Sequence, residues 1–153
     1  MSELLEKLYP ALLTKALLDV IKNIIKHVSE YGTGGDPLYI TFNPYGPGTI
    51  LPNYLQEQYP DGMTIVLQHQ YENLEVNDGS FSVTLSFNGM STRVCVPWIN
   101  IMVFLDEKLG FGINMSDYDE NFFRQPKKAP IPEGENIILF PDGGKDGDPR
   151  SKS

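Results

Sequence analysis

Apolar residues recur every three or four positions from residue 3 to residue 30, and this spacing predicts one long amphipathic helix. Ser2, followed by Glu3 and Glu6, suits the start of a helix, whereas Pro10 predicts a kink or a later start. The apolar stripe is wide, so it either packs on its own domain alone or also pairs with a second copy of the chain. We expect a dimer interface formed by Leu13, Leu17, Val20, Ile21, Ile24 and Val28.

The period changes to two after the glycine-rich stretch YGTGGDP (residues 31–37), which ends the helix and links it to the next part. Alternation of apolar and polar residues predicts strands in LYITF, MTIVLQHQY, SFSVTLSF, TRVCV and GFGINM. Asn77-Asp78-Gly79 and Asn88-Gly89 are typical hairpin turns. The middle of the chain is therefore expected to form antiparallel hairpins.

Two short helices are predicted among these strands. One is NYLQEQY, residues 53–59, and the other is PWINIMVFLDE, residues 97–107, where Trp98, Ile99, Met102 and Val103 have helical spacing. Hairpins with so little helix indicate a small barrel or sandwich. The predicted fold class is mainly β with an N-terminal α-helix, in the form of a small antiparallel barrel.

Residues after Ser116 show no periodicity and are rich in proline and glycine, which predicts a flexible C-terminal tail. We therefore divide the chain into a helix (1–31), a β domain (36–116) and a tail (117–153). Within the tail, apolar residues stand at four consecutive positions, and an acid follows shortly after: Ile137, Ile138, Leu139, Phe140 and Asp142. Such a run cannot build a core by itself, so it favours a short linear motif that binds a partner, or else it folds back onto its own domain.

The charges are unevenly distributed along the chain. Residues 1–35 carry no net charge, residues 36–123 carry −9 and residues 124–153 carry +1, within a total of −8. A body with this excess of acids repels a phosphate backbone, so we expect no nucleic-acid partner. Glu3 and Glu6 interrupt the start of the chain, and no apolar run is long enough for a membrane span, so we expect a cytoplasmic protein without a membrane partner.

Residues that could carry out chemistry are few. His27 and His69 have no second ligand at a metal-binding spacing, and no serine lies in a nucleophile elbow. Cys95, the single cysteine, lies between valines and is expected to be buried in the core without an adjacent base. These patterns predict neither an enzyme nor a bound cofactor or metal.

The polar block in TIVLQHQY is the strongest candidate for a binding site. In a continuous strand, Ile65, Leu67, His69 and Tyr71 would share one face, whereas Gln68 and Gln70 would lie on the other. Amide side chains both donate and accept hydrogen bonds, which suits recognition of an extended peptide backbone. The alternative is that these side chains only face water or satisfy a nearby loop.

The segments LYITF, YPDGMTIVLQHQY, FSVTLSFNG, RVCVPW and FGINM, in this order, resemble the stringent starvation protein B (SspB) family, particularly its α-proteobacterial branch. The likeness covers roughly residues 36–115. It implies a non-enzymatic adaptor that binds the ssrA degradation tag of ribosome-rescued polypeptides and delivers them to the ClpXP protease. It also implies a homodimer joined through N-terminal helices and a small, partly Sm-like barrel.

The resemblance also implies roles for individual residues. Gln68 matches a tag-contacting glutamine of the family's VLQHQ block, and His69, Gln70 and Tyr71 continue that block. Residues Ile137 to Asp142 lie where this branch carries a motif that docks on ClpX, although here GGKDGDPRSKS follows without another aromatic residue. The partly Sm-like body leaves RNA binding as the alternative function, which the acidic charge of residues 36–123 disfavours.

Overall fold

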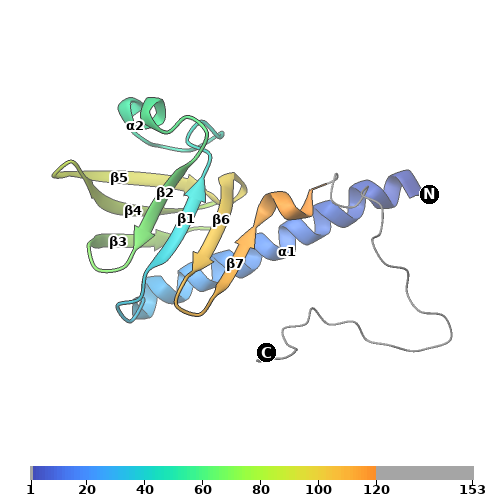
Figure 1. Ribbon diagram of the computed structural model, residues 1–153, viewed down its shortest axis with the longest axis horizontal. Coiled ribbons are helices and arrows are strands. Elements are labelled where there is room, and N and C mark those ends of the chain that lie inside the picture. Colours follow the sequence, from blue (N-terminus) through green and yellow to red (C-terminus); the bar gives the residue numbers. More distant parts are fainter. Residues whose placement is uncertain (1, 120–153) are drawn as a thin grey trace.

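The computed structural model describes residues 2–119, in which a long N-terminal helix packs beside two antiparallel β-sheets (Figure 1). The helices are α1 (Ser2–Tyr31) and α2 (Asn53–Gln58), and two turns of 3₁₀ helix span Trp98–Asn100 and Met115–Tyr118. The strands are β1 (Leu38–Phe42), β2 (Met63–Leu67), β3 (Tyr71–Val76), β4 (Ser80–Phe87), β5 (Met90–Pro97), β6 (Ile101–Asp106) and β7 (Phe111–Asn114).

The strands form one sheet in the order β2-β1-β6-β7 and another in the order β3-β4-β5. Every pairing within these sheets is antiparallel. The predicted class, mainly β with an N-terminal helix, is confirmed. The two sheets are not closed into one continuous barrel, however, and strands β2 and β3 both lie at sheet edges. The chain passes from one edge to the other through the three residues Gln68–Gln70.

One hydrophobic core lies between the sheets and the helix. Alternating residues of the strands supply most of it, as the period of two requires, including Ile40 and Phe42 of β1 and Phe81 and Val83 of β4, all 0% exposed. Helix α1 contributes Ile21, Ile25 and Val28 to the same core and packs mainly against β3. The second half of α1 is therefore part of the folded body.

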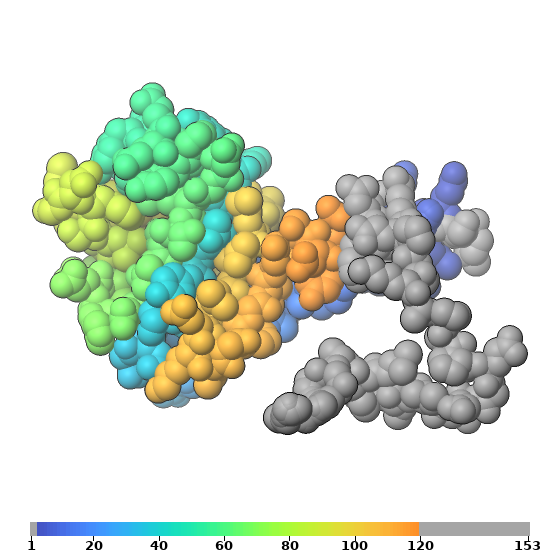
Figure 2. Space-filling view, viewed as in Figure 1, coloured from blue at the N-terminus to red at the C-terminus, as the bar shows by residue number. Residues whose placement is uncertain are grey.

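The first half of α1 projects beyond the sheets (Figure 1). The helix is continuous through Pro10, so the later start that this proline allowed does not occur. Leu4 and Leu12 are 67% and 55% exposed, and Val20 further along is 41% exposed. In the space-filling view, α2 covers the upper part of the visible face, β2, β1 and β6 lie below it, and part of α1 emerges behind the body (Figure 2).

Three sequence-based predictions about local structure are wrong. Residues 97–107 do not form a helix: a single 3₁₀ turn at Trp98–Asn100 leads directly into β6. The block MTIVLQHQY is not one strand, because β2 ends at Leu67 and β3 begins at Tyr71. Cys95 was expected in the core but is only half-buried, on the face of β5 opposite Val94 and Val96. The short helix predicted in residues 53–59 is confirmed as α2.

Candidate binding groove

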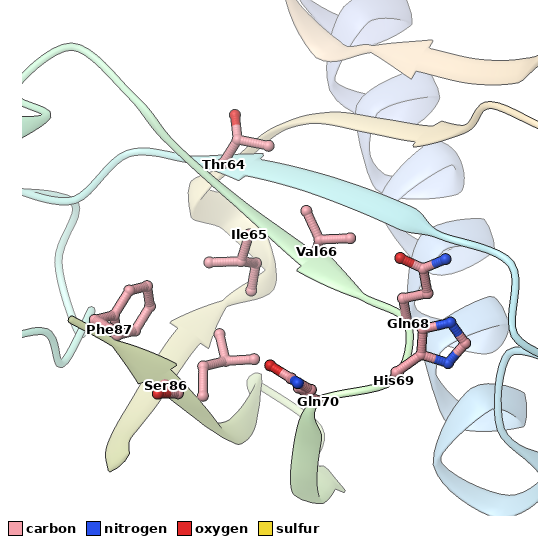
Figure 3. Close-up of a pocket in the computed structure, with 9 residues that line it drawn as sticks. Thr64, Ile65, Val66, Gln68, His69, Gln70, Ser86 and Phe87 are labelled. Atoms are coloured by element: carbon pink, nitrogen blue, oxygen red, sulfur yellow. The ribbon is translucent and has the colours of Figure 1, made fainter. Parts of the chain in front are cut away.

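A groove of about 410 Å³ lies between the edge strand β2 and the end of β4 (Figure 3). Its walls come from β2, from the crossover between the sheets and from the last residues of β4. The lining residues are Thr64, Ile65, Val66, Gln68, His69, Gln70, Leu85, Ser86 and Phe87.

The sheet topology explains why backbone is available at this groove. Strand β2 pairs only with β1, so its other edge has no strand partner in the described part of the chain. On the opposite wall, the pairing of β3 with β4 begins at Tyr71 and Leu85, so Ser86 and Phe87 pair only with β5. Two strand edges with free backbone groups therefore border the same groove.

The groove combines apolar walls with a polar rim. Ile65 and Leu85 are buried, Phe87 is half-buried, and Val66 is 39% exposed. Ile65 lies on the opposite side of the β2 ribbon from Thr64 and Val66, and Gln68, His69 and Gln70 follow at one end of the groove (Figure 3). Such a combination of apolar surface and amide groups suits a ligand with both apolar side chains and a peptide backbone.

Three of the four residues predicted to bind a peptide line the groove together: Gln68, His69 and Gln70. Tyr71 does not line it and instead packs against the hydrophobic core. The expected division into two strand faces is wrong, because Gln68–Gln70 form the bend between the two sheets. Their shared location therefore results from the crossover rather than from strand alternation.

Sequence reasoning did not identify the β2 and β4 residues that complete the groove. The segment FSVTLSFNG carried part of the family resemblance, and the strand predicted from its alternation is confirmed as β4. No local pattern indicated that Ser86 and Phe87 extend past the end of β3, because that depends on strand register.

The Gln68 side chain is anchored to the linker between α1 and β1. Its Nε2 donates a hydrogen bond to the carbonyl oxygen of Gly35 at 3.1 Å. Thr33 Oγ1 donates to the backbone carbonyl oxygen of Gln68 at 3.4 Å, and the Gly35 N–H donates to Thr33 Oγ1 at 3.2 Å. The amide at the rim of the groove is therefore held from behind by a short turn.

No cluster of three or more histidine, cysteine, aspartate or glutamate side chains within residues 2–119 could hold a metal ion. Among the described residues, the lining of the groove also contains no lysine or arginine that would attract a phosphate backbone. The residues that line the groove can form hydrogen bonds and apolar contacts with a ligand.

The predicted dimer-interface residues do not share one environment. Ile21 and Val28 are buried in the core of their own chain, and Leu17 and Ile24 are partly buried against it. Leu13 is also partly buried, and Val20 is exposed. A groove of about 770 Å³ runs beside the second half of α1, where Val20, Ile24, His27 and Tyr31 face the linker. The predicted docking residues Ile137–Asp142 lie outside the described residues.

The sequence matches the family model described as stringent starvation protein B over residues 11–150. The chain belongs to the stringent starvation protein B family. This family membership supports a general role as an adaptor of a protease rather than as an enzyme. Comparison with curated proteins gave no match. No helix within residues 2–119 is long and apolar enough to cross a membrane.

Proposed function

We propose that this SspB-family protein binds polypeptides that carry the ssrA tag and delivers them to the ClpXP protease for degradation. The observation that carries the proposal is the groove between β2 and β4, where two free strand edges border a partly apolar cavity with amide groups at its rim. An extended peptide has the complementary groups: backbone donors and acceptors along its edges and side chains on alternate faces.

The tag would bind as an additional strand along the free edge of β2. Backbone hydrogen bonds to β2 supply affinity for any extended peptide, and side-chain contacts supply selectivity. Ile65 and Phe87 offer apolar contacts, whereas the amides of Gln68 and Gln70 bind polar groups of the tag. His69 lies at the same end of the groove and completes the rim.

A homodimer joined through α1 would present two such grooves. The exposed leucines in the first half of α1, together with Val20, form an apolar surface without a partner among the described residues. In a two-fold dimer the same surface of each helix buries that of its copy. Leu13, Leu17 and Ile24 would contribute their exposed parts, whereas Ile21 and Val28 support the helix from within its own core.

The tail would connect this assembly to the protease in the cytoplasm. In the proposed domain organisation, helix 1–31 dimerises, residues 36–116 bind the tag, and residues 117–153 carry the docking segment. Ile137–Phe140 with Asp142 would dock on ClpX as a short linear motif, and a dimer carries two such tails. The assignment to the α-proteobacterial branch remains a prediction from the sequence.

Titration of a fluorescein-labelled ssrA-tag peptide, followed by fluorescence anisotropy, tests the proposal. We expect the wild-type protein to bind the tag peptide and not a scrambled version of it. Gln68→Ala should weaken binding about tenfold, since a polar group of the bound peptide loses its partner. Gln58→Ala is a matched control, because Gln58 is exposed on α2 outside the groove. Equal binding of both peptides would refute the function.

A further inference from the structure

Gln68 is held in a fixed orientation by the turn that follows α1. The Gln68 amide nitrogen lies on the side of this linker, and its amide oxygen lies on the side of Val66 (Figure 3). The nitrogen donates to the carbonyl oxygen of Gly35, and among the described residues no donor contacts Oε1. The side chain thus uses one of its two N–H donors within the protein, and its acceptor oxygen remains available to a ligand.

The turn itself is anchored at both ends. On one side, the N–H of Gly32 donates to the carbonyl oxygen of Val28 at 2.7 Å, and Val28 is buried in the core. On the other side, the linker continues into β1, whose first residue Leu38 is buried as well. Both ends of the linker are therefore attached to the hydrophobic core, and this fixes the position from which Thr33 contacts the backbone of Gln68.

The backbone conformation at position 35 requires a glycine. Its φ of +91° lies in the left-handed region, which an L-residue with a side chain adopts only with strain. A Cβ atom at this position would lie 3.6 Å from Cε1 of His69, which is an ordinary contact distance, so the backbone conformation and not the available space requires the glycine. The conformation of Gly35 directs its carbonyl oxygen toward Gln68, so the acceptor that fixes the amide depends on a glycine at this position.

We propose that Thr33 and Gly35 are positioning residues of the tag site, which hold Gln68 so that its Oε1 accepts a hydrogen bond from a backbone N–H of the bound peptide. This inference rests on the proposed function and specifies the contact at one end of the groove. Without the linker contacts the amide could rotate and present either end to the ligand, and binding would then include the entropy of ordering it.

A double-mutant cycle on the full-length protein tests this coupling. Thr33→Val removes the hydroxyl but keeps the size and branching of the side chain, and Thr33→Ser is the control that restores the hydroxyl. We expect Thr33→Val to weaken binding of the labelled ssrA-tag peptide about three- to tenfold, and Thr33→Ser to bind nearly as wild type. In a Gln68→Ala background, Thr33→Val should have a much smaller effect, because the Thr33 hydroxyl orients the Gln68 amide by holding Gly35, whereas its bond to the backbone of residue 68 is lost in both backgrounds alike.

Equal weakening by Thr33→Val in the presence and absence of the Gln68 amide would overturn the proposed positioning role. Side-chain amide NMR signals of Gln68 in the peptide-free protein give a second readout. In wild type and Thr33→Ser the two amide protons should exchange slowly, whereas in Thr33→Val they should resemble those of the exposed Gln58. Unchanged signals in Thr33→Val would also reject the inference.

Peptide binding and the NMR signals together distinguish failure of this inference from failure of the proposed function. If the wild-type protein does not bind the tag peptide, the proposed function and the peptide contact of Oε1 are both refuted. The NMR signals would still decide whether Thr33 holds the Gln68 amide. If the wild-type protein binds and the cycle shows no coupling, only the positioning role is refuted.

Discussion

The side-chain amide of Asn100 occupies the space beside Gly46 that a Cβ atom at residue 46 would need. Asn100 is only 7% exposed, and its Nδ2 donates hydrogen bonds to the Pro47 carbonyl oxygen at 3.0 Å and to Thr49 Oγ1 at 2.9 Å. These contacts fasten the loop after β1 to the 3₁₀ turn before β6. The loop thereby keeps a fixed path over one end of the sheet that carries β2.

Gly46→Ala should therefore destabilise the fold, because the added methyl group displaces Asn100 from two buried hydrogen bonds. We expect a loss of about 1–3 kcal/mol in the free energy of unfolding, measured by urea denaturation. Gly79→Ala is the matched control, because a Cβ there meets no heavy atom within 4 Å. Similar losses in the two variants would show that the Asn100 contact is not responsible.

The regular elements could be predicted from the sequence because their periodicity is strong. In both α1 and β4 the apolar residues recur with a regular period, because each element buries one face. The helix predicted for residues 97–107 is wrong because IMVFL, residues 101–105, is a continuous apolar run, and such a run does not distinguish a helix from a strand. Strand β6 lies between β1 and β7, and it buries Ile101 and Phe104 whereas Met102 is 38% exposed, so its apolar residues do not follow its burial.

The binding groove could be predicted only in part. The resemblance to a family drew attention to Gln68–Gln70, and all three residues line the groove. The contribution of Ser86 and Phe87 depends on where β3 stops pairing with β4, and that register follows from packing of the two sheets. The contact of Gln68 with Gly35 joins positions 33 residues apart, which no local pattern reveals.

Phe87 offers a test of the groove that does not involve the polar rim. This side chain is half-buried at the end of β4 and lines the groove. Phe87→Ala should weaken binding of the ssrA-tag peptide about tenfold, because an apolar contact of the bound peptide is lost. The measurement is the same anisotropy titration, at a temperature where unfolding curves show the variant to be fully folded.

The matched control for this variant is Phe111→Ala. Phe111 is 45% exposed on β7, packs edge-to-face with Phe104, and does not line the groove. We expect this variant to lose stability without loss of tag affinity. A tag affinity that falls equally in both variants would point to general destabilisation rather than to the groove between β2 and β4.

Helix α1 has two adjacent positions, Val20 and Ile21, at which a charged residue should have different effects, on dimer formation at the first and on folding at the second. Val20 is 41% exposed, whereas Ile21 is 0% exposed within the core of its own chain. Leu12→Glu together with Val20→Glu should convert the proposed dimer into folded monomers, because each buried apolar side chain contributes about 1.5–3 kcal/mol to association. Sedimentation equilibrium measures the mass, and circular dichroism measures the remaining fold.

Ile21→Glu should instead unfold the chain, because it places an unpaired charge in the core. This contrast separates the dimerising surface from the supporting surface of the same helix. A wild-type chain that sediments as a monomer at the concentrations at which it binds tag would refute the dimer. A folded Ile21→Glu variant would refute the packing of α1 described above.

Delivery to the protease should depend on the apolar run in the tail and not on the groove. Proline, glycine and charged residues flank Ile137–Phe140, so the neighbouring residues in the sequence offer no apolar surface on which this run could pack. The run therefore suits a short linear motif that binds a partner. Two tails on a dimer would compensate for weak docking by each one.

Truncation before Gly134 should therefore leave tag-peptide affinity unchanged and abolish the stimulation of ClpXP degradation of a tagged substrate. Leu139→Asp combined with Phe140→Asp should have the same effect, since charged side chains cannot enter an apolar docking site. Truncation after Gly144 is the control, because it keeps residues 137–142 and removes a similar kind of polar sequence. The readout is the initial rate of loss of a fluorescent tagged protein at a concentration below its KM. If the chain truncated before Gly134 still accelerates this reaction, docking resides elsewhere, because the tag groove alone holds the substrate without bringing it to the protease.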